Sequence, residues 1–289
     1  MIKENINQLI EEITRDHQQD DIYQAKKDFQ KISGEIFEDD KSYESRMGAF
    51  LEWYTFDRTC PGSVLTPLQH YLQGTSITPE SRELADSISQ SIHGLFIAKK
   101  VKNDHVIVID IMDNEKYKVL ENEGSILFNA DDLFEGRLIL YKGQYYFTDH
   151  FCYHPKPTVG FILSKIKSLK TIEKEALTKE KYLQKTIVSP QKSLKKITAK
   201  LEKVNGKLAG TTKEKKIQSL KEEIAKLEDQ KAQLESQISD IENQLTELRT
   251  KTIEGEHKQN RFTFIRKLSY MSLKWERSRQ IDVRDIYQD

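Results

Sequence analysis

Between residues 165 and 252, apolar residues recur at alternating spacings of three and four. This spacing is typical of the a and d positions that form the seam between two helices of a coiled coil. The downstream series is Ile217, Leu220, Ile224, Leu227, Lys231, Leu234, Ile238, Ile241, Leu245 and Leu248. The upstream series is Leu183, Ile187, Pro190, Leu194, Ile197, Leu201 and Val204.

The two series come into register if the chain folds back over residues 205–212. Val204 then faces Ile217, and the one irregular position of each series, Pro190 and Lys231, falls in the same layer. Residues 161–210 carry 13 lysines and 4 glutamates, whereas residues 217–249 carry 8 acidic and 4 basic residues. Because opposite charges beside a seam favour pairing, we predict an antiparallel coiled-coil hairpin within one chain. A monomer is favoured.

Two local signals refine the predicted hairpin. Ser189 and Pro190 resemble a helix start, so the first limb is expected to be two helices or one kinked helix. The weak layer formed by Pro190 and Lys231 is interpreted as a hinge. Thr211 and Glu214 have the spacing of a capping box for the second limb.

The first 91 residues have helical periodicity. Proline follows Thr66 and Thr78, which is the pattern of a capped helix start, and Gly74 is placed to end the first of these two helices. Three further helices are predicted from apolar stripes: Ile2, Ile6, Leu9, Ile10 and Ile13; Ile22, Ala25, Phe29, Ile32 and Ile36; and Tyr43, Met47, Phe50, Leu51 and Tyr54.

Near Gly94 the pattern changes to short segments rich in β-branched and aromatic residues. Lys142 and Gly143 suit a tight hairpin between the last two of them. The segments are 94–101, 105–111, 115–120, 136–142 and 144–151. They predict a small antiparallel sheet, either an SH3-like or an OB-like barrel, which needs cover from neighbouring helices.

Together these patterns predict an α+β protein in four segments. They are a helical domain over 1–91, a β module over 92–155, the hairpin arm over 156–254, and a C-terminal helix and tail over 255–289. In the last segment Phe264, Leu268, Met271 and Trp275 repeat at helical spacing, so this helix is expected to return to the globular part.

Composition narrows the possible functions. The 46 basic and 46 acidic residues cancel, so binding to a polyanion would need a local basic patch. Two cysteines, Cys60 and Cys152, provide no disulfide framework. The first residues lack the basic and apolar regions of a secretory signal, and no apolar run reaches the roughly 20 residues of a membrane span. We therefore expect a cytoplasmic protein that is not embedded in a membrane.

His150, Cys152 and His154 alternate along a predicted strand and would share one face. They are weak candidates for a metal site, with Cys60 or His70 as a fourth ligand. Their spacing matches no known ligand pattern, and aromatic neighbours suit an ordinary packed strand, so a structural role is favoured. Catalysis by Cys152 is a weaker hypothesis still.

The carboxylates of Glu52 and Asp57 are five residues apart in the segment FLEWYTFDR. On an α-helix they would diverge by about 140°, which argues against a catalytic pair. Motifs for phosphate loops, dinucleotide binding, nucleophile elbows and zinc peptidases are missing from the sequence. No cofactor and no catalytic residue is predicted.

Three segments of the chain carry a resemblance to known proteins: FLEWYTFDR, TPLQHYL at 66–72 and DLFEGRLILYKGQYYF at 132–147. Over about residues 45–150 the chain resembles a group of uncharacterised bacterial proteins with an F-x-E-W-aromatic helix, a T-P-L helix and a small β module. This resemblance implies no particular activity.

Three functional hypotheses follow. The first is a non-enzymatic interaction or adaptor protein whose arm engages another protein. The second is a nucleic-acid- or ribosome-associated factor that uses the lysine-rich stretch 165–207 and the aromatic residues Tyr145, Tyr146 and Phe147 of the β module. The third is an unrecognised metal-dependent enzyme.

Overall fold

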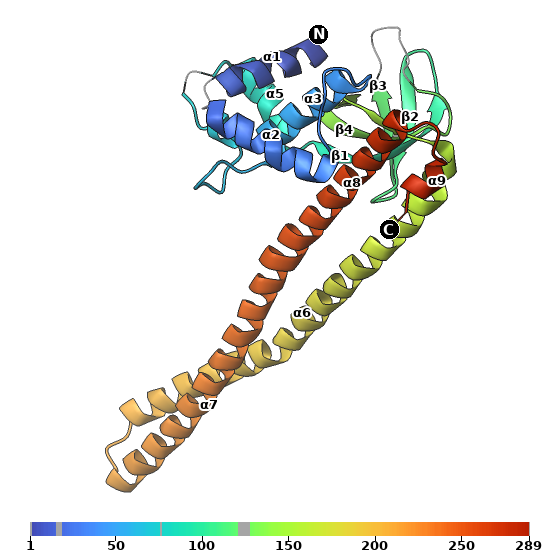
Figure 1. The fold of residues 1–289 in the computed structure, drawn as a ribbon. Helices are drawn as coiled ribbons and strands as arrows, with labels where there is room; N and C mark the ends of the chain where they lie inside the picture. Colours follow the sequence, from blue (N-terminus) through green and yellow to red (C-terminus); the bar gives the residue numbers. More distant parts are fainter. Residues whose placement is uncertain (1, 16–18, 76, 121–127, 289) are drawn as a thin grey trace. The chain divides into compact units, whose positions relative to one another are not determined.

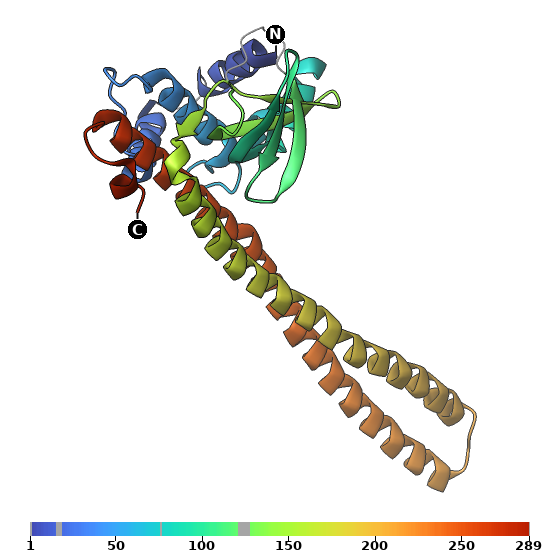
Figure 2. The same cartoon turned by 90° about the vertical axis from the view of Figure 1, so that its right-hand side faces the viewer.

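The computed structural model describes residues 2–15, 19–75, 77–120 and 128–288. Its contacts divide the chain into two compact units. A globular unit contains Met1–Ser168 and Phe262–Asp289, and an arm contains Leu169–Arg261 (Figures 1 and 2). The α+β class predicted from the sequence is confirmed. The helical segment, the β module and most of the C-terminal segment belong to the same unit.

The N-terminal helices of the globular unit follow the predicted apolar stripes, except that Ile36 lies beyond the end of the second helix and Tyr54 lies in a π-helical turn after the third. The stripe Ile6, Leu9, Ile10 and Ile13 is buried. The predicted cap at Thr66 is a complete capping box with Gln69, and Thr78 caps the following helix through Ser81 N–H. The helices are α1 (Ile2–Arg15), α2 (Gln19–Ser33), α3 (Tyr43–Glu52), α4 (Pro67–Leu72) and α5 (Pro79–Ser89).

A π-helical turn, Trp53–Asp57, continues α3. Its i→i+5 pattern is visible in the bond from Arg58 N–H to the Trp53 carbonyl, at 2.9 Å. π-Helical turns are rare and change which side chains share a face of the helix. The segment FLEWYTFDR is therefore not a regular α-helix.

The β module forms a closed barrel. Its strands are β1 (Ile92–Val101), β2 (His105–Asp110), β3 (Glu115–Leu120), β4 (Leu133–Tyr141), β5 (Gln144–Phe147) and β6 (Cys152–His154). The order is β1-β2-β3-β5-β4, and β4 pairs with β1 to close the ring. Only the β3–β5 pairing is parallel among the described strands. This strand order is that of an OB-like barrel, one of the two architectures expected.

The predicted strands are confirmed, with changes at the end of the module. The last predicted segment, 144–151, is split, because β5 ends at Phe147 and a separate β6 begins at Cys152. Lys142 and Gly143 have φ values of 49° and 75°, so the predicted tight hairpin is present, with the positive φ at both central positions that a type I′ turn requires.

Strand β4 positions the polar residues of the globular unit. Phe134 and Leu138 belong to the barrel core, with Phe96 and Phe147 from other strands. Because side chains alternate along a strand, Glu135 and Arg137 lie on the opposite face of β4. Both are buried, at 3% and 2% exposure, under side chains from the helices.

The arm is a helical hairpin. Its limbs are α6 (Val159–Ala209), of which the part from Leu169 belongs to the arm, and α7 (Glu214–Glu247). A π-helical segment, Leu248–Glu256, joins α7 to α8 (His257–Arg277). Burial along the limbs follows the predicted spacing: every seam residue named above is buried or half-buried, whereas most positions between them are exposed. Leu201 and Val204 share a cluster with Leu220 and Leu227.

One local expectation for the arm is narrowed and another needs correction. α6 is continuous through Pro190, so of the two alternatives expected for the first limb, one helix is present and two separate helices are excluded. The predicted capping box of Thr211 and Glu214 is wrong, because α7 begins at Glu214 after Lys213, and no side chain caps this start.

The C-terminal helix returns to the globular unit, as expected. Its buried face is Ile265, Arg266, Leu268, Ser269 and Leu273. Of the predicted stripe, only Leu268 belongs to this face, since the buried positions include two polar residues that an apolar pattern does not identify. After α8 comes the short helix α9 (Val283–Ile286). Among the described helices, none combines the length and apolar content that a membrane span requires.

Candidate functional site

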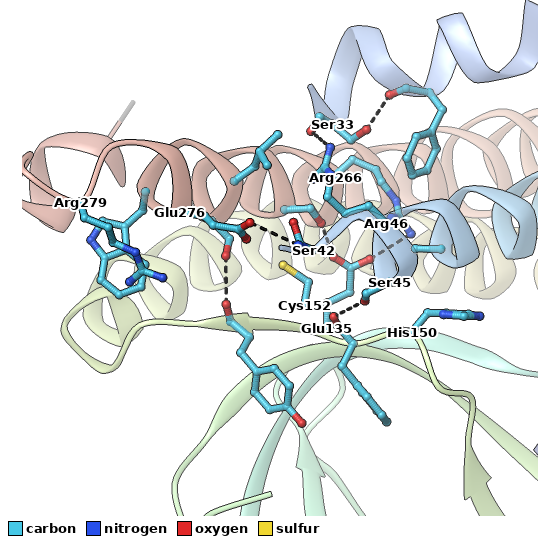
Figure 3. Close-up of a pocket in the computed structure, with 18 residues that line it drawn as sticks. Ser33, Ser42, Ser45, Arg46, Glu135, His150, Cys152, Arg266, Glu276 and Arg279 are labelled. Atoms are coloured by element: carbon cyan, nitrogen blue, oxygen red, sulfur yellow. Dashed lines mark hydrogen bonds and ion pairs between the residues drawn. The ribbon is translucent and has the colours of Figure 1, made fainter. Parts of the chain in front are cut away.

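A cavity of about 370 Å³ lies within the globular unit. Its walls come from the end of α2, from α3, from β4, from residues 150–153 and from α8. Figure 3 shows charged side chains reaching the cavity from two helices and from the sheet: Arg46 on α3, Arg266 on α8 and Glu135 on β4. These three residues are all at least nine-tenths buried.

Glu135 is the centre of a hydrogen-bonded cluster at one wall. Its Oε1 lies 2.9 Å from Arg266 Nη2 and 2.8 Å from His93 Nε2, and its Oε2 accepts a bond from the Ser269 hydroxyl. Burial alone would raise the pKa of Glu135, but Arg266, His93 and Ser269 outweigh it and hold the pKa below its ordinary value. Glu135 is therefore a carboxylate that is fully engaged.

His93 is neutral in this cluster, because burial and the neighbouring Arg266 lower its pKa despite the bond to Glu135. Its Nε2 also lies 2.8 Å from Arg266 Nη2. This nitrogen either donates to Glu135 or accepts from Arg266, according to its tautomer. In both cases the ring is committed to the cluster and is not free to act on a ligand.

A second buried cluster on β4 joins Arg137 to both carboxylates of FLEWYTFDR. Arg137 Nε donates to Glu52 Oε2 at 3.2 Å, and Nη2 donates to Asp57 Oδ2. Burial opposes the charge of Asp57, but Arg137 outweighs it, so the pKa of Asp57 is lowered. The expectation that Glu52 and Asp57 diverge is therefore wrong. It assumed an α-helix, whereas the π-helical turn lets both reach one guanidinium.

Arg46 differs from the other two buried arginines. Its Nη2 donates to the backbone carbonyls of Ser33 and Gly34, at 2.7 and 3.0 Å. Its Nε, like that of Arg266, has no hydrogen-bond partner among the described residues. Unlike Arg137 and Arg266, however, Arg46 has no described carboxylate within ion-pair distance. Burial lowers the pKa of Arg46. A cation without a counterion thus faces the cavity.

Two of the three candidate metal ligands, His150 and Cys152, line the cavity, whereas His154 does not. His150 precedes β6, and its ring lies directly on α3, where a Cβ at Gly48 would overlap it. Cys152 lines the cavity. His154 is buried, and its Nδ1 lies 3.0 Å from the Tyr287 hydroxyl. Within the described ranges, no three His, Cys, Asp or Glu residues form a group that could hold a metal ion.

The two residues suggested as a fourth metal ligand, Cys60 and His70, lie away from the cavity. Cys60 is a half-buried free cysteine whose pKa is raised by burial and by Asp21. His70 Nε2 lies 3.0 Å from the Ser63 hydroxyl. Neither residue lines the cavity.

The chemistry of the cavity favours binding over nucleophilic catalysis. Burial, with a further contribution from Glu135, raises the pKa of Cys152 to about 12, so its thiol stays protonated near neutral pH. Burial lowers the pKa of His154 to about 4, which leaves a neutral imidazole held by Tyr287. Besides His150 and the carboxylates of Glu135 and Glu276, the polar groups of the wall are serine hydroxyls and guanidinium N–H groups, which can donate hydrogen bonds to an anion.

Comparison with known proteins shows the family of the chain. The model of a family of unknown function (DUF7986) matches residues 1–186, which is more than half of the sequence. The chain belongs to this family. The match extends beyond the resemblance noted over residues 45–150 and agrees with it that the relatives are uncharacterised. Searches of curated proteins and of solved structures give no match.

The family match covers most of the cavity wall. It includes α3 and β4, and therefore Arg46 and Glu135, whereas α8 and Arg266 lie outside the matched residues. Sequence reasoning did not identify Arg46, Glu135 or Arg266. One signal was present: in the strand LFEGRLILY, Glu135 and Arg137 are charged residues two apart in an otherwise apolar segment, which indicates a face that buries paired charges.

Proposed function

We propose that the protein is a non-enzymatic interaction protein whose arm engages another protein, and that the two limbs of the arm wind as an antiparallel coiled coil. The observation that carries this proposal is that the hairpin satisfies its own apolar seam. Its outer surface is then available along the whole length, while the cavity offers no activated nucleophile. A long paired arm of this kind is suited to presenting a surface to a partner.

Ion pairs between the limbs support pairing within one chain. Lys200 Nζ lies 3.7 Å from Glu223 Oε1, and Arg249 Nε lies 2.6 Å from Glu180 Oε1. In each pair one residue comes from α6 and the other from the return limb. The Lys200–Glu223 pair has the polarity predicted from the sequence, a basic first limb against an acidic second limb, whereas the Glu180–Arg249 pair has the reverse polarity.

Apolar side chains outside the seam indicate where a partner binds. Leu177 and Val188 on α6 are 44% and 42% exposed. They are eleven residues apart, which is about three turns, so they lie on the same side of the helix. They are about 16 Å apart along the helix, with the polar residues Lys181 and Gln184 between them. We call this pair of exposed apolar side chains the strip, and we propose that it contacts the partner.

The test combines a shortened arm with a matched pair of surface variants. Deleting residues 188–233 and joining Ile187 to Leu234 through a short turn preserves the predicted register of the remaining layers. The double variant Leu177→Gln/Val188→Gln removes the strip but keeps good helix formers. Its control is Lys179→Gln/Thr186→Gln, two exposed positions about half a turn away.

Each protein is used to capture partners from native cells after nuclease treatment, and recovered proteins are quantified by mass spectrometry. We expect a partner that is recovered with wild type and with the control, reduced with the strip variant, and lost with the shortened arm. Equal recovery of all partners with the shortened arm would refute the proposal.

A second function, binding of nucleic acid, is supported by charge at the end of the arm. Residues 190–223 contain ten lysines and four glutamates, and all ten lysines are exposed. Among the described residues only Lys200 in this set forms an ion pair. The barrel adds exposed Lys116 and Lys118 on β3, the strand that OB-like barrels use with β2 to bind oligonucleotides.

This alternative is tested by fluorescence anisotropy with a labelled single-stranded oligonucleotide. Binding through lysines should weaken as the salt concentration rises. Replacing Lys195, Lys196 and Lys203 by glutamine should make the slope of log K against log salt concentration less steep by about 0.7 for each phosphate contact that is lost. The control replaces Lys179 and Lys185, which lie nearer the base of the arm. Binding that is insensitive to salt would exclude this function.

A further inference from the structure

The cavity contains a buried positive charge that the described residues do not neutralise. Arg46 is 9% exposed and donates only to two backbone carbonyls, which carry partial charges. Its Nε has no described partner, and neither does the buried hydroxyl of Ser42, at the start of the same helix. Buried donors are normally satisfied, and a buried cation is normally paired, so a missing acceptor is indicated.

The other charged groups at the cavity do not fill this role. Glu135 is occupied by Arg266, His93 and Ser269. Glu276 accepts a bond from the backbone N–H of Ser42 at 3.2 Å. The lining holds three arginines and two glutamates, but the third arginine, Arg279, is exposed and its guanidinium lies over the Trp275 ring. The buried charge that has no carboxylate beside it is therefore that of Arg46.

The rest of the wall is largely apolar. It includes Phe29, Phe151, Leu273 and Trp275. The volume of about 370 Å³ lies near the lower end of the range for small-molecule sites. An aromatic and aliphatic wall with a few convergent donors is the composition of a site for a compact apolar molecule with one polar group.

We propose that this cavity binds a small monoanion in which one carboxylate is attached to an apolar body the size of a ring. Arg46 and Ser42 bind the carboxylate, and the apolar wall encloses the body. One buried guanidinium without a carboxylate partner matches a monovalent carboxylate better than a phosphate dianion, and its planar geometry suits carboxylate oxygens. The proposal is independent of the arm and of its partner.

The first experiment needs no variant. Isothermal titration of the full chain is carried out with benzoate, with benzyl alcohol as its neutral analogue, with benzylamine as its cationic analogue, and with inorganic phosphate. We expect one site for benzoate, binding at least about tenfold weaker for benzyl alcohol, and none for benzylamine. Equal binding of benzoate and benzyl alcohol, tighter binding of phosphate, or no benzoate binding at millimolar concentration would overturn the proposal.

The second experiment locates the site. Arg46→Lys keeps the charge but loses the fork of donors, and Ser42→Ala removes one unpaired hydroxyl. Both should weaken benzoate binding, Arg46→Lys by about tenfold. The matched control is Arg82→Lys, because Arg82 also donates to two backbone carbonyls, those of Leu72 and Gly74, but does not line this cavity.

A fluorescence readout tests whether the ligand binds beside the cavity wall. The chain has two tryptophans, so Trp53→Phe leaves Trp275 in the cavity wall as the single reporter. Benzoate should change the Trp275 emission in this background, and the change should disappear when Ser42→Ala and Arg46→Lys are added. Unchanged affinity in a folded Arg46→Lys protein, or a silent Trp275 under saturating benzoate, would contradict the assignment.

Discussion

Arg137 is the residue whose loss should most destabilise the globular unit. It is 2% exposed and joins β4 to the end of α3 through Glu52 and Asp57. It also donates to the Ser91 hydroxyl at 2.9 Å, and its guanidinium lies 5.3 Å from the centre of the Phe56 ring. Replacing Arg137 by methionine keeps most of its apolar contact but removes all of these charge-assisted bonds.

The size of the effect follows from what is left behind. Glu52 is 4% exposed, and its Oε1 already has no described partner. Without Arg137 its Oε2 also loses its donor, so a carboxylate stays buried with neither oxygen paired. Removing one partner of a buried ion pair costs about 3–5 kcal/mol. For a unit of this size each kcal/mol lowers the melting temperature by about 2–4 °C, which predicts a decrease of roughly 6–20 °C.

The assay is urea unfolding followed by tryptophan fluorescence, with thermal melting as a second measurement. The double variant Arg137→Met/Glu52→Leu replaces the pair with apolar residues and should recover at least about 2 kcal/mol of the loss. The control Arg58→Met removes an arginine whose side chain is 15% exposed, against 2% for Arg137, and it should cost less than half as much. A loss below about 1 kcal/mol for Arg137→Met would refute the reasoning.

Three further predictions concern other contacts. Since burial lowers the pKa of His154 to about 4, stability is retained above the unfolded pKa of 6.5 and lost as the pH falls toward 4. In urea titrations, His154→Gln should reduce the loss of unfolding free energy between neutral pH and pH 4 by up to about 3 kcal/mol. His93, whose pKa is also lowered, should account for much of the remaining loss. Gly48→Ala should destabilise the protein by about 1–3 kcal/mol because the added Cβ displaces the His150 ring. Adding His150→Ala should restore stability, and a double variant that stays destabilised would refute this contact. Lys231→Leu should stabilise the arm by about 1–2 kcal/mol in thermal melts, and if the Lys231 layer is a hinge, the same change should reduce partner capture; undiminished capture would exclude the hinge.

The regular elements were predictable because each carries its own periodic signal. The arm is the best example: seam positions from Leu183 to Leu248 could be assigned by spacing alone, since a paired helix buries a fixed fraction of its surface. The barrel strands were equally visible through β-branched and aromatic runs. Closure of the barrel through β1 and β4 depends on contacts between strands far apart in sequence, so no local pattern identifies it.

The candidate site was not predictable, for two physical reasons. Glu52 and Asp57 meet at Arg137 because of one π-helical turn, and an α-helical wheel assigns them to different sides. The cavity itself combines Arg46, Glu135 and Arg266 across more than 200 residues of sequence. His150, Cys152 and His154 were predicted as candidate ligands from their residue types alone. In the structure, His150 packs on α3 and His154 is hydrogen-bonded to Tyr287.

The ion pair between Glu173 and Arg261 has a consequence for how the protein is synthesised. Both carboxylate oxygens of Glu173 are bound, at 2.6 and 2.7 Å, and the two residues stand near the first and last positions of the arm. During translation the barrel emerges long before Arg266, so Glu135 has no guanidinium from α8 until the ribosome has produced the whole insertion. An unstructured insertion of this length would add several kcal/mol of loop entropy to that final docking. A hairpin that pairs as it emerges, with its two ends held together by Glu173 and Arg261, removes most of this cost before α8 is released from the ribosome.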